Sequence, residues 1–353
     1  MYKLRRRPQI ISTYIDKYGV TYGFLRQGFE CRPYVKFDAN GVALLDYSVY
    51  NYTANLNLEY NIGSICEYAL ENILLYEMTS EMSYLTRFMI QIDWLVRMKQ
   101  ERKSALCWEI TYDYADVKSP WVSGMINGLA ISCLTKAYLY TNDTSYLTYA
   151  SAAADFYDID VSNGGFTTSF GDQQIFFQQY TNCAEWRRYG LNGFLVSILG
   201  LLDLNRMTGT TRVQDLLDRS ITYLKGHIHL WESKGIWTNL YRSEVGVSKS
   251  IDYHIFHSEL MYAIAAMTGD GDLYKIYDNW ASIEPETALA IVENHDKYKN
   301  SDCFEIIDLM IPEQIVKSLQ IHCRNQNDNR TRSGITYGFI KRLMTKGDSS
   351  CDC

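Results

Sequence analysis

Tyrosine is the residue type that most marks this sequence as a candidate for chemistry. The chain has 353 residues and contains 29 tyrosines, against 13 phenylalanines and 7 tryptophans. A tyrosine combines a flat apolar ring with a hydroxyl group, so it suits wet grooves that bind sugars or peptides. Tyrosines also fill the rim of an apolar core, and composition alone favours this second interpretation.

Other reactive residue types lack the spacing that familiar sites require. The nine cysteines are scattered and form no CxxC pair, which argues against a zinc knuckle or a thioredoxin-like site. His227 and His229 could share a metal on a strand, but their segment is predicted to pass from a helix into a loop. GxGxxG, P-loop, HExxH and serine-hydrolase motifs are absent. We therefore expect neither a metal nor another cofactor.

Composition and charge narrow the class of protein. Hydrophobic residues make up 47% of the chain and charged residues 21%, the usual mix for a packed globular core. The net charge of −7 disfavours general nucleic-acid binding. Residues 1–12 are basic but precede no apolar run, and the longest apolar stretch, near residues 194–202, is about half a membrane span. We expect a soluble, cytoplasmic protein that binds neither nucleic acid nor membrane.

Local patterns divide the chain into regions of different structure. Short alternating stretches on both sides of a turn at residues 38–41 predict strands or a hairpin near the N-terminus. From about residue 60, apolar residues recur at steps of three and four, which predicts helices. We expect a short β-rich region over residues 1–55, a helical domain over 56–322, and a partly disordered C-terminal extension over 323–353.

A helix pair that repeats four times decides the predicted fold. Each copy has an apolar helix, a short polar turn with a threonine, and a second helix. Such pairs cannot bury their apolar faces alone, so we predict a mainly α protein, an α/α-toroid or incomplete α/α-barrel of repeated hairpins. An open solenoid is the alternative, but long connectors rich in glycine and aromatic residues fit a toroid better, because they would line a cleft at one mouth. The turn threonines, roughly 60 residues apart, are Thr79, Thr141, Thr208 and Thr268.

An ordered set of motifs along this repeat resembles the C-terminal domain of the D-glucuronyl C5-epimerases, the enzymes of heparosan and heparan sulfate. The motifs are WVSGMINGLAISCLTKAY, SYLTYASAAADF, NGGF, FFQQY, LNGFLVSILGLLDL and DYHIFH, and the resemblance covers roughly residues 60–285. It implies a carbohydrate-active isomerase that removes a proton from C5 of a uronosyl residue in a polysaccharide and returns one to the opposite face. That reaction needs two acid/base groups, and positive charge or hydrogen bonds on the carboxylate.

The resemblance implies roles for particular tyrosines. It places an acid/base tyrosine at Tyr253, in DYH, and a second functional tyrosine at Tyr180, in QQY. A tyrosine with an ordinary pKa of about 10 is a poor base at neutral pH, so nearby cations must help. The alternative for the DYHIFH segment is a helix start whose aromatic residues pack.

The chain departs from the family pattern at two motifs. The second glutamate of the family's EEY motif is a base, but Gln179 stands here and cannot accept a proton. In the YDLRH-like motif, aligning the arginines puts Arg242 on the family arginine and Asn239 on the family tyrosine. Tyr241, two positions later, could face the same side of an extended segment. Arg242 suits a substrate carboxylate through bidentate binding, and a surface ion pair is its alternative. Glu185 could replace the missing carboxylate, or be a solvated loop acid.

Three functions stay open at this point. The first is a C5-epimerase acting on an anionic polysaccharide, the second a divergent enzyme acting on a modified peptide or a non-uronate glycan, and the third a non-catalytic binding protein. Formation of a homodimer also stays open. The predicted catalytic residues are Tyr253, Tyr180 and Tyr241, and the predicted substrate-binding residues are Arg242, Gln179, Asn239, His254, Asn192, Trp121 and Arg187.

Overall fold

Most of the predicted helical domain is described by the computed structural model. Asn239 and the predicted C-terminal extension lie outside the described residues. Among the helices described, none is long and apolar enough to cross a membrane. The described residues are 15–16, 19–20, 29, 34–49, 56–233, 237–238, 240–242 and 251–281.

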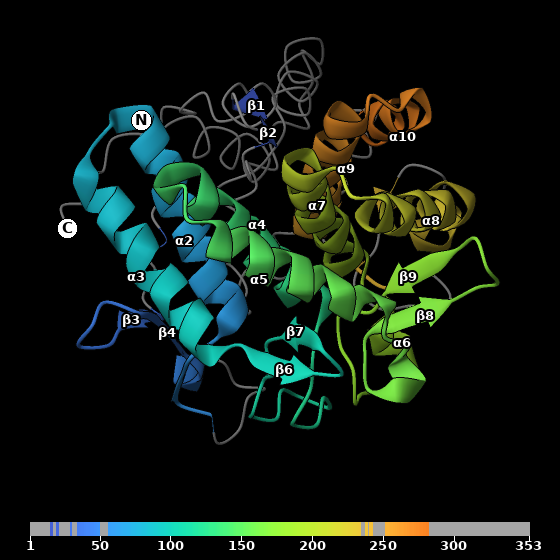
Figure 1. Cartoon of the computed structure of the whole chain (residues 1–353). Coiled ribbons are helices and arrows are strands. Elements are labelled where there is room, and N and C mark those ends of the chain that lie inside the picture. The colour runs from blue at the N-terminus through green and yellow to red at the C-terminus, as the bar shows by residue number, and fades with distance from the viewer. Residues whose placement is uncertain are drawn as a thin grey trace, which may run out of the picture.

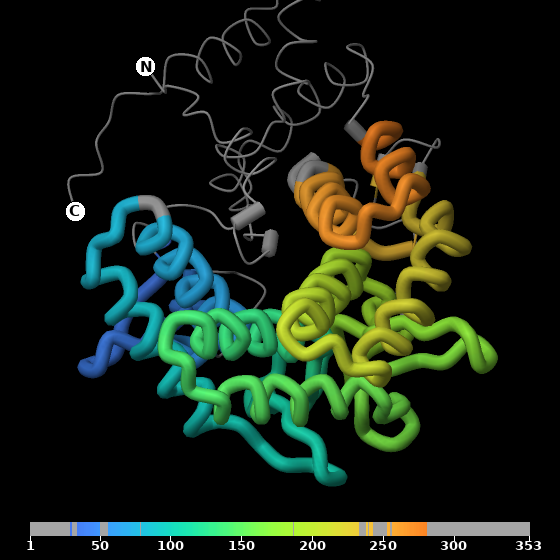
Figure 2. Tube along the Cα trace, turned by 45° about the horizontal axis from the view of Figure 1, so that its top comes forward, coloured from blue at the N-terminus to red at the C-terminus, as the bar shows by residue number. Residues whose placement is uncertain are grey.

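Four helix hairpins follow one another along an arc (Figures 1 and 2). In every hairpin the first helix ends at one of the predicted turn threonines, so the repeat seen in the sequence is confirmed. The pairs are α2 (Ile62–Thr79) with α3 (Met82–Met98), α4 (Gly124–Thr141) with α5 (Thr144–Asp155), α7 (Leu191–Thr208) with α8 (Thr211–His227), and α9 (Ile251–Thr268) with α10 (Gly271–Ala281).

The threonines end their helices by a repeated set of hydrogen bonds. Each hydroxyl donates to the carbonyl four residues earlier, as from Thr141 to Ala137 at 2.7 Å and from Thr208 to Leu204 at 3.0 Å. The next residue adopts a left-handed conformation, and its N–H bonds back to the helix, which closes the last turn. These left-handed residues are Ser80, Asn142, Gly209 and Gly269.

Burial separates the helices into two layers. The first helices of the pairs contact one another in sequence, α2 with α4, α4 with α7, and α7 with α9. In α7 every residue from Leu191 to Leu204 is buried, so this helix is enclosed on all sides. The second helices bury one face only; in α8 the buried positions include Val213, Leu216, Ser220 and Leu224. The inner and outer layers are those of an α/α-toroid, which confirms the predicted fold class.

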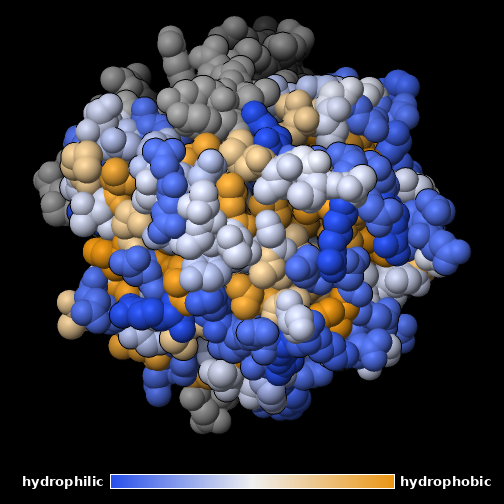
Figure 3. Space-filling view, in the orientation of Figure 1, coloured by the Kyte–Doolittle hydropathy of each residue, from blue (hydrophilic) through white to orange (hydrophobic). Residues whose placement is uncertain are grey.

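The outer helices give the molecule a largely polar exterior. Figure 3 shows hydrophilic and neutral surface over most of this face, with smaller apolar areas between. In α3 the side chains of Phe88, Ile92 and Leu95 are buried, whereas Asp93 and Arg97 are exposed. The amphipathic pattern of these helices therefore matches their position at the outside of the toroid.

The inner helices α4 and α7 approach each other at two glycines. A Cβ atom added at Gly200 would lie 2.3 Å from the carbonyl oxygen of Gly128, and one added at Gly128 would lie 2.8 Å from the carbonyl oxygen of Val196. The backbones of the two helices are thus in direct contact, which a side chain at either glycine would prevent.

The N-terminal region contains the predicted hairpin. Strands β3 (Val35–Phe37), β4 (Ala43–Asp46) and β5 (Leu58–Glu59) form an antiparallel sheet. At the turn, the Asp38 carboxylate accepts hydrogen bonds from the N–H groups of Asn40 (2.8 Å) and Val42 (2.9 Å). A second antiparallel pair joins β1 (Ile15–Asp16) to β2 (Gly19–Val20).

Long connectors join each outer helix to the next inner helix, and they gather at one end of the toroid, seen in the lower right of Figure 1. Hydrogen bonds tie the two later connectors to the start of an earlier inner helix: Gly124 N–H donates to the Gln178 carbonyl (3.0 Å), and Leu191 N–H to the Leu240 carbonyl (2.9 Å). The connectors contain β6 (Gln100–Arg102), β7 (Ala105–Cys107), β8 (Thr167–Ser169), β9 (Ile175–Phe177), α6 (Glu185–Arg188), β10 (Glu232–Ser233) and β11 (Trp237–Thr238), and the 3-10 segments are η2 (Tyr47–Val49), η3 (Phe156–Asp158), η4 (Val161–Asn163) and η5 (Ile228–Trp231).

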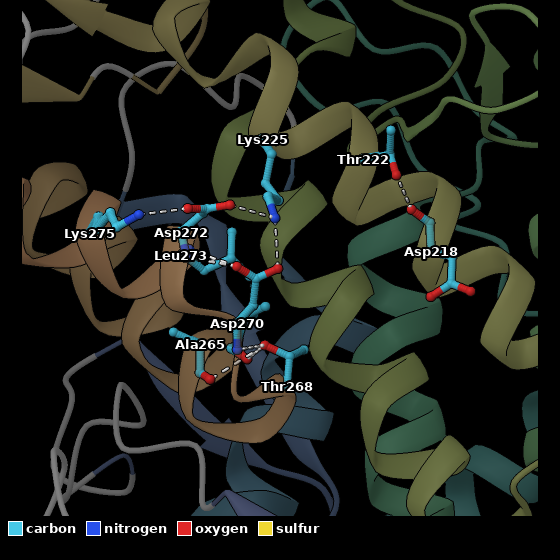
Figure 4. A network of polar contacts seen from close by, with 10 residues as sticks. Asp218, Thr222, Lys225, Ala265, Thr268, Asp270, Asp272, Leu273 and Lys275 are labelled. Carbon is cyan, nitrogen blue, oxygen red and sulfur yellow. Dashed lines mark hydrogen bonds and ion pairs between the residues drawn. The ribbon is translucent and has the colours of Figure 1, made fainter.

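Polar contacts also join the last two hairpins (Figure 4). Lys225 of α8 places its ammonium 2.8 Å from a carboxylate oxygen of Asp270 and 3.1 Å from one of Asp272. Asp270 also accepts a hydrogen bond from the N–H of Asp272 (2.8 Å) at the start of α10. Single exposed ion pairs contribute little stability, but this shared lysine fixes the turn of the last hairpin against α8.

Candidate functional site

Three predicted catalytic tyrosines from different parts of the chain meet at the connector end of the toroid. Tyr180 follows β9, Tyr241 follows β11, and Tyr253 lies in the first turn of α9. Tyr241, Tyr253 and Tyr114 are all close enough to Tyr180 to raise the pKa of its hydroxyl electrostatically. Tyr114, in the connector before α4, was not among the predicted site residues, because no motif distinguishes it from the other tyrosines. We call Tyr114, Tyr180, Tyr241 and Tyr253 the tyrosine cluster.

Arg187 is the cation that contacts this cluster. Its Nη1 donates a hydrogen bond to the Tyr241 hydroxyl at 3.4 Å, and its guanidinium carbon lies 5.7 Å from the centre of the Tyr180 ring. Its Nε forms an ion pair with Asp116, whose two carboxylate oxygens are shielded from solvent. Arg187 was predicted to bind substrate, whereas Asp116 was missed because its partner lies in a different connector.

Burial dominates the protonation of the tyrosine cluster. Burial raises the pKa of Tyr180 well above its ordinary value, the neighbouring tyrosines raise it further, and Arg187 opposes the rise. Burial likewise raises the pKa of Tyr241 to about 12, again against the effect of Arg187. Both hydroxyls therefore carry their protons at neutral pH, and Arg187 is the group that favours their ionised form.

A row of tyrosines continues from the cluster toward the N-terminal sheet. The Tyr114 and Tyr180 rings lie 6.2 Å apart with an interplanar angle of 17°. The Tyr47 ring is 6.1 Å from Tyr114, and its hydroxyl lies 3.2 Å from that of Tyr112. Trp121 packs against Tyr180, with ring centres 5.5 Å apart, and is only 6% exposed. That burial fits the packing alternative, and a substrate contact by Trp121 stays a prediction.

Gln179 occupies a close-fitting position between the starts of α4 and α7. Its Nε2 lies 3.4 Å from the Tyr180 hydroxyl and 3.6 Å from the sulfur of Met125. A Cβ atom at Gly190 would lie 1.9 Å from its Oε1, and one at Gly193 would lie 2.6 Å from its Cβ. Two glycines of the LNGF region thus make room for this side chain, and a glutamate of the same shape would fit.

Polar atoms without partners are found beside Gln179. The Oε1 of Gln179 and the Oδ1 of Asn192 are buried and have no hydrogen-bond partner among the described residues. The Nδ2 of Asn192 lies 4.0 Å from the Met125 sulfur, so both side chains flank the same methionine. Buried acceptors of this kind cost free energy unless a ligand or water satisfies them, which supports a binding role for both predicted residues.

Arg242 packs among aromatic side chains that do not belong to the tyrosine cluster. Its guanidinium carbon is 3.9 Å from the centre of the Tyr189 ring and 5.5 Å from that of Trp231. Its Nη2 donates to the Tyr223 hydroxyl at 2.7 Å. No carboxylate of the described residues pairs with it, so a surface ion pair is not what the structure shows. Residues 240–241 form a bend and not the predicted extended segment; Tyr241 contacts Arg187, whereas its neighbour Arg242 contacts the aromatic rings.

Two buried histidines hold the start of α9. His254 is fully buried; its Nδ1 accepts the Thr238 N–H at 3.2 Å, and its Nε2 lies 3.0 Å from the Trp280 carbonyl. His257 contacts the Thr238 hydroxyl at 2.9 Å and places its ring 6.0 Å from that of Tyr253. Because protein groups engage both nitrogens of His254, its predicted substrate contact has no support from the geometry. The histidines instead position Tyr253.

These histidines predict a stability that falls in acid. Burial lowers the pKa of His254 from 6.5 to about 4, and burial with the neighbouring His254 holds the pKa of His257 well below its usual value. Between pH 6.5 and about pH 4, His254 binds a proton in the unfolded chain but not in the folded chain. His254 alone should then lower the free energy of unfolding by about 3 kcal/mol across that range.

Urea unfolding at a series of pH values tests this expectation. The His254→Gln variant should show a shallower loss of stability between pH 6.5 and 4, whereas His229→Gln, at an exposed position of η5, should keep the wild-type slope. An unchanged slope in His254→Gln would contradict the assignment.

The structure also places Glu185, the possible replacement carboxylate. Glu185 begins α6 and is exposed, as expected of a solvated loop acid. Among the residues described, no group of histidine, cysteine or acidic side chains has the arrangement of a metal site.

The family assignment follows from comparison with known proteins. The family model for the D-glucuronyl C5-epimerase C-terminus matches residues 100–282, just over half of the chain. This chain belongs to that family. It is 27% identical over 215 residues to the D-glucuronyl C5-epimerase of Caenorhabditis elegans; the match covers 55% of this chain and 34% of the worm protein. The chain thus spans about a third of that relative.

The α/α-toroid is also found in solved structures of other epimerases in this comparison. The cellobiose 2-epimerase of Bacillus thermoamylovorans has a TM-score of 0.50 with 14% sequence identity, and the match covers 81% of this chain and 82% of that one. The cellobiose 2-epimerase of Spirochaeta thermophila has a TM-score of 0.47 with 14% identity, covering 66% of this chain and 60% of that one. At such identity the likeness concerns the fold, and function must be argued from the site.

Proposed function

We propose that this member of the C5-epimerase family exchanges the C5 proton of uronosyl residues in an anionic polysaccharide. The observation that carries the proposal is the tyrosine cluster, in which Tyr180 and Tyr241 contact Arg187 and Tyr253 acts electrostatically on Tyr180. Tyrosine hydroxyls supply proton donors, and a guanidinium supplies the positive charge that a uronate carboxylate needs. Membership of the family supports the choice of C5 as the reacting atom.

The proposed reaction balances with groups of this chain alone. A base takes the C5 proton, and the electron pair left behind is delocalised into the carboxylate, whose oxygens gain negative charge. Arg187 stabilises that charge, and a tyrosine hydroxyl on the other face of the ring returns a proton to C5. We assign the base to Tyr253 in its ionised form and the proton donor to Tyr180, whose hydroxyl carries its proton at neutral pH, because Tyr241 is hydrogen-bonded to Arg187.

Arg187 is a better candidate for the carboxylate than Arg242. Arg187 contacts Tyr241 and lies over the Tyr180 ring, whereas Arg242 contacts Tyr189 and Tyr223. Arg242, stacked on aromatic rings, would instead bind a neighbouring acidic sugar or shape the connector. Because the protein has a net charge of −7, a polyanion needs local positive charge to bind, and these two arginines would supply it.

A second candidate function follows from Gln179. A neutral amide at the family's base position also fits a protein that binds glycans on its tyrosine row, or an enzyme that acts on a non-uronate glycan or a modified peptide. Deuterium incorporation separates these functions. The protein is incubated with heparosan and other uronate polymers in deuterated water, and C5 deuterium is measured by NMR. Binding without incorporation would favour the glycan-binding function and refute proton exchange.

Replacing Gln179 by glutamate is expected to raise the exchange rate by about 100-fold or more. General acid–base groups typically contribute 10²- to 10⁴-fold, and the space left by Gly190 and Gly193 accepts a glutamate without rearrangement. Initial rates of C5 deuteration measure the effect.

Gln178→Glu is the matched control for this change. Gln178 is buried and donates to the Thr168 hydroxyl at 2.6 Å, so a carboxylate there should bring no gain in rate. A folded Gln179→Glu variant that exchanges no faster than wild type would show that the base lies elsewhere.

A further inference from the structure

We propose that Asp116 is a positioning residue of this site: its ion pair with Arg187 fixes the guanidinium between the Tyr180 ring and the Tyr241 hydroxyl. No motif of the sequence points to Asp116. Its role in proton exchange rests on the proposed function, but its effect on Arg187 and Tyr241 does not.

The backbone holds Asp116 in a defined turn. Tyr114 and Val117 exchange two backbone hydrogen bonds, of 3.0 and 2.9 Å, so Asp116 lies inside a closed four-residue turn. Val117 is fully buried and anchors the turn in the core. The same turn thus presents Tyr114 and Asp116 from neighbouring positions.

Hydrogen bonds also join this turn to the connector that carries Tyr180 and Arg187. Lys118 N–H donates to the Asn182 carbonyl at 2.9 Å, and the Asn182 side chain donates to the Pro120 carbonyl at 2.6 Å. The distance between Asp116 and Arg187 is therefore set by two bonded connectors and does not depend on long side chains reaching across solvent.

The shielding of the pair makes its charges effective. The Arg187 side chain is 17% exposed and the Asp116 side chain 38%, although both Asp116 oxygens are buried, so water screens the field of the pair only in part. Arg187 lowers the pKa of Tyr241, whereas Asp116, Tyr114 and Cys183 raise it. The charge of Asp116 thus opposes the effect of Arg187 on the pKa of Tyr241, while the ion pair holds the guanidinium in place.

Because Gln179 is neutral, the carboxylate of Asp116 takes on added importance at this site. Among the described residues, Asp116 is the carboxylate that contacts the cation of the tyrosine cluster. It balances the charge of Arg187 in the resting protein and comes from a different connector than the family's glutamate. When a uronate binds, its carboxylate would share Arg187 with Asp116, which would weaken binding of the uronate.

Fluorine NMR of protein labelled with 3-fluorotyrosine tests the inference without any substrate. Fluorine lowers the phenol pKa and brings the titration into a measurable range, and the Tyr241→Phe variant identifies the Tyr241 signal. In Arg187→Gln the titration midpoint of Tyr241 should rise, and in Asp116→Asn it should rise as well, because the released guanidinium leaves the hydroxyl; loss of the Asp116 charge alone would lower it. The double variant should match Arg187→Gln. Asp215→Asn, an exposed helix residue of α8, is the control and should leave the signal unchanged.

The outcomes separate the inference from the proposed function. If the Tyr241 midpoint in Asp116→Asn stays at the wild-type value or falls, the inference is overturned, whatever the activity. If the midpoint rises but no uronate polymer is deuterated, the proposed function fails alone. Asp116→Glu, which keeps the carboxylate, should restore the wild-type midpoint. Should Asp116→Asn not fold, Asp116→Ser gives the same comparison.

Discussion

Replacing Tyr253 by phenylalanine is expected to lower the rate of C5 deuteration by about 10²- to 10⁴-fold. The substitution removes one oxygen and leaves the ring, which lies 6.0 Å from the His257 ring, in its packing environment. Its electrostatic effect on Tyr180 places Tyr253 within the cluster that surrounds Arg187. With a neutral amide at Gln179, a tyrosine hydroxyl must perform a transfer that a carboxylate would otherwise perform.

Tyr146→Phe is the matched control for that loss. Tyr146 lies in the first turn of the outer helix α5, next to the threonine turn at the far end of the toroid. Its hydroxyl should have no effect on the rate, and both variants should unfold at the wild-type urea midpoint. A Tyr253→Phe protein with unchanged deuteration would remove Tyr253 from every catalytic version of the proposal.

The largest expected effect on stability is that of Gly200→Ala. The added methyl group would lie 2.3 Å from the carbonyl oxygen of Gly128, and this obstacle is backbone that cannot rotate away. Helices α4 and α7 would have to separate along the centre of the inner layer. We expect a loss of about 3 kcal/mol or more in the free energy of unfolding, at the upper end for overpacked cores.

Gly226→Ala makes the same chemical change, but it is expected to raise the free energy of unfolding. Gly226 lies in the outer helix α8, with open space where a Cβ atom would point. Because alanine is the better helix former, this variant should gain up to about 1 kcal/mol. Urea unfolding of both variants measures the difference; equal midpoints would show that the helix crossing tolerates a side chain.

The helix pairs could be predicted because their signals are local. Thr141 and Thr208 end their helices with bonds to residues four positions earlier, so a periodic sequence contains all the information that the turn needs. The apolar run of α7 likewise marks an enclosed helix before any contact is known. Tyr180, Tyr241 and Tyr253 were found through ordered motifs.

The contacts of the arginines could not be predicted, because they depend on distances between connectors. Nothing near Asp116 indicates that it meets Arg187, and nothing near Arg242 indicates that Tyr189 and Tyr223 enclose it. His254 was predicted from its position next to Tyr253 in the sequence, but the helix directs its ring into the core. In each case the side-chain direction, set by the fold, decided the role.

The two ends of the toroid differ in how independently they can change during evolution. At the threonine turns, the bonds that close each turn lie inside the helix pair, although Lys225 of α8 also pairs with the last turn. At the connector end, the start of α4 depends on Gln178 and the start of α7 on Leu240, so two connectors support the helix start of a neighbouring repeat. New specificity would therefore arise by exchanging adjacent connectors together. Grafting a relative's connector singly should disturb the helix start that it supports, whereas grafting two neighbours should transfer the chemistry intact.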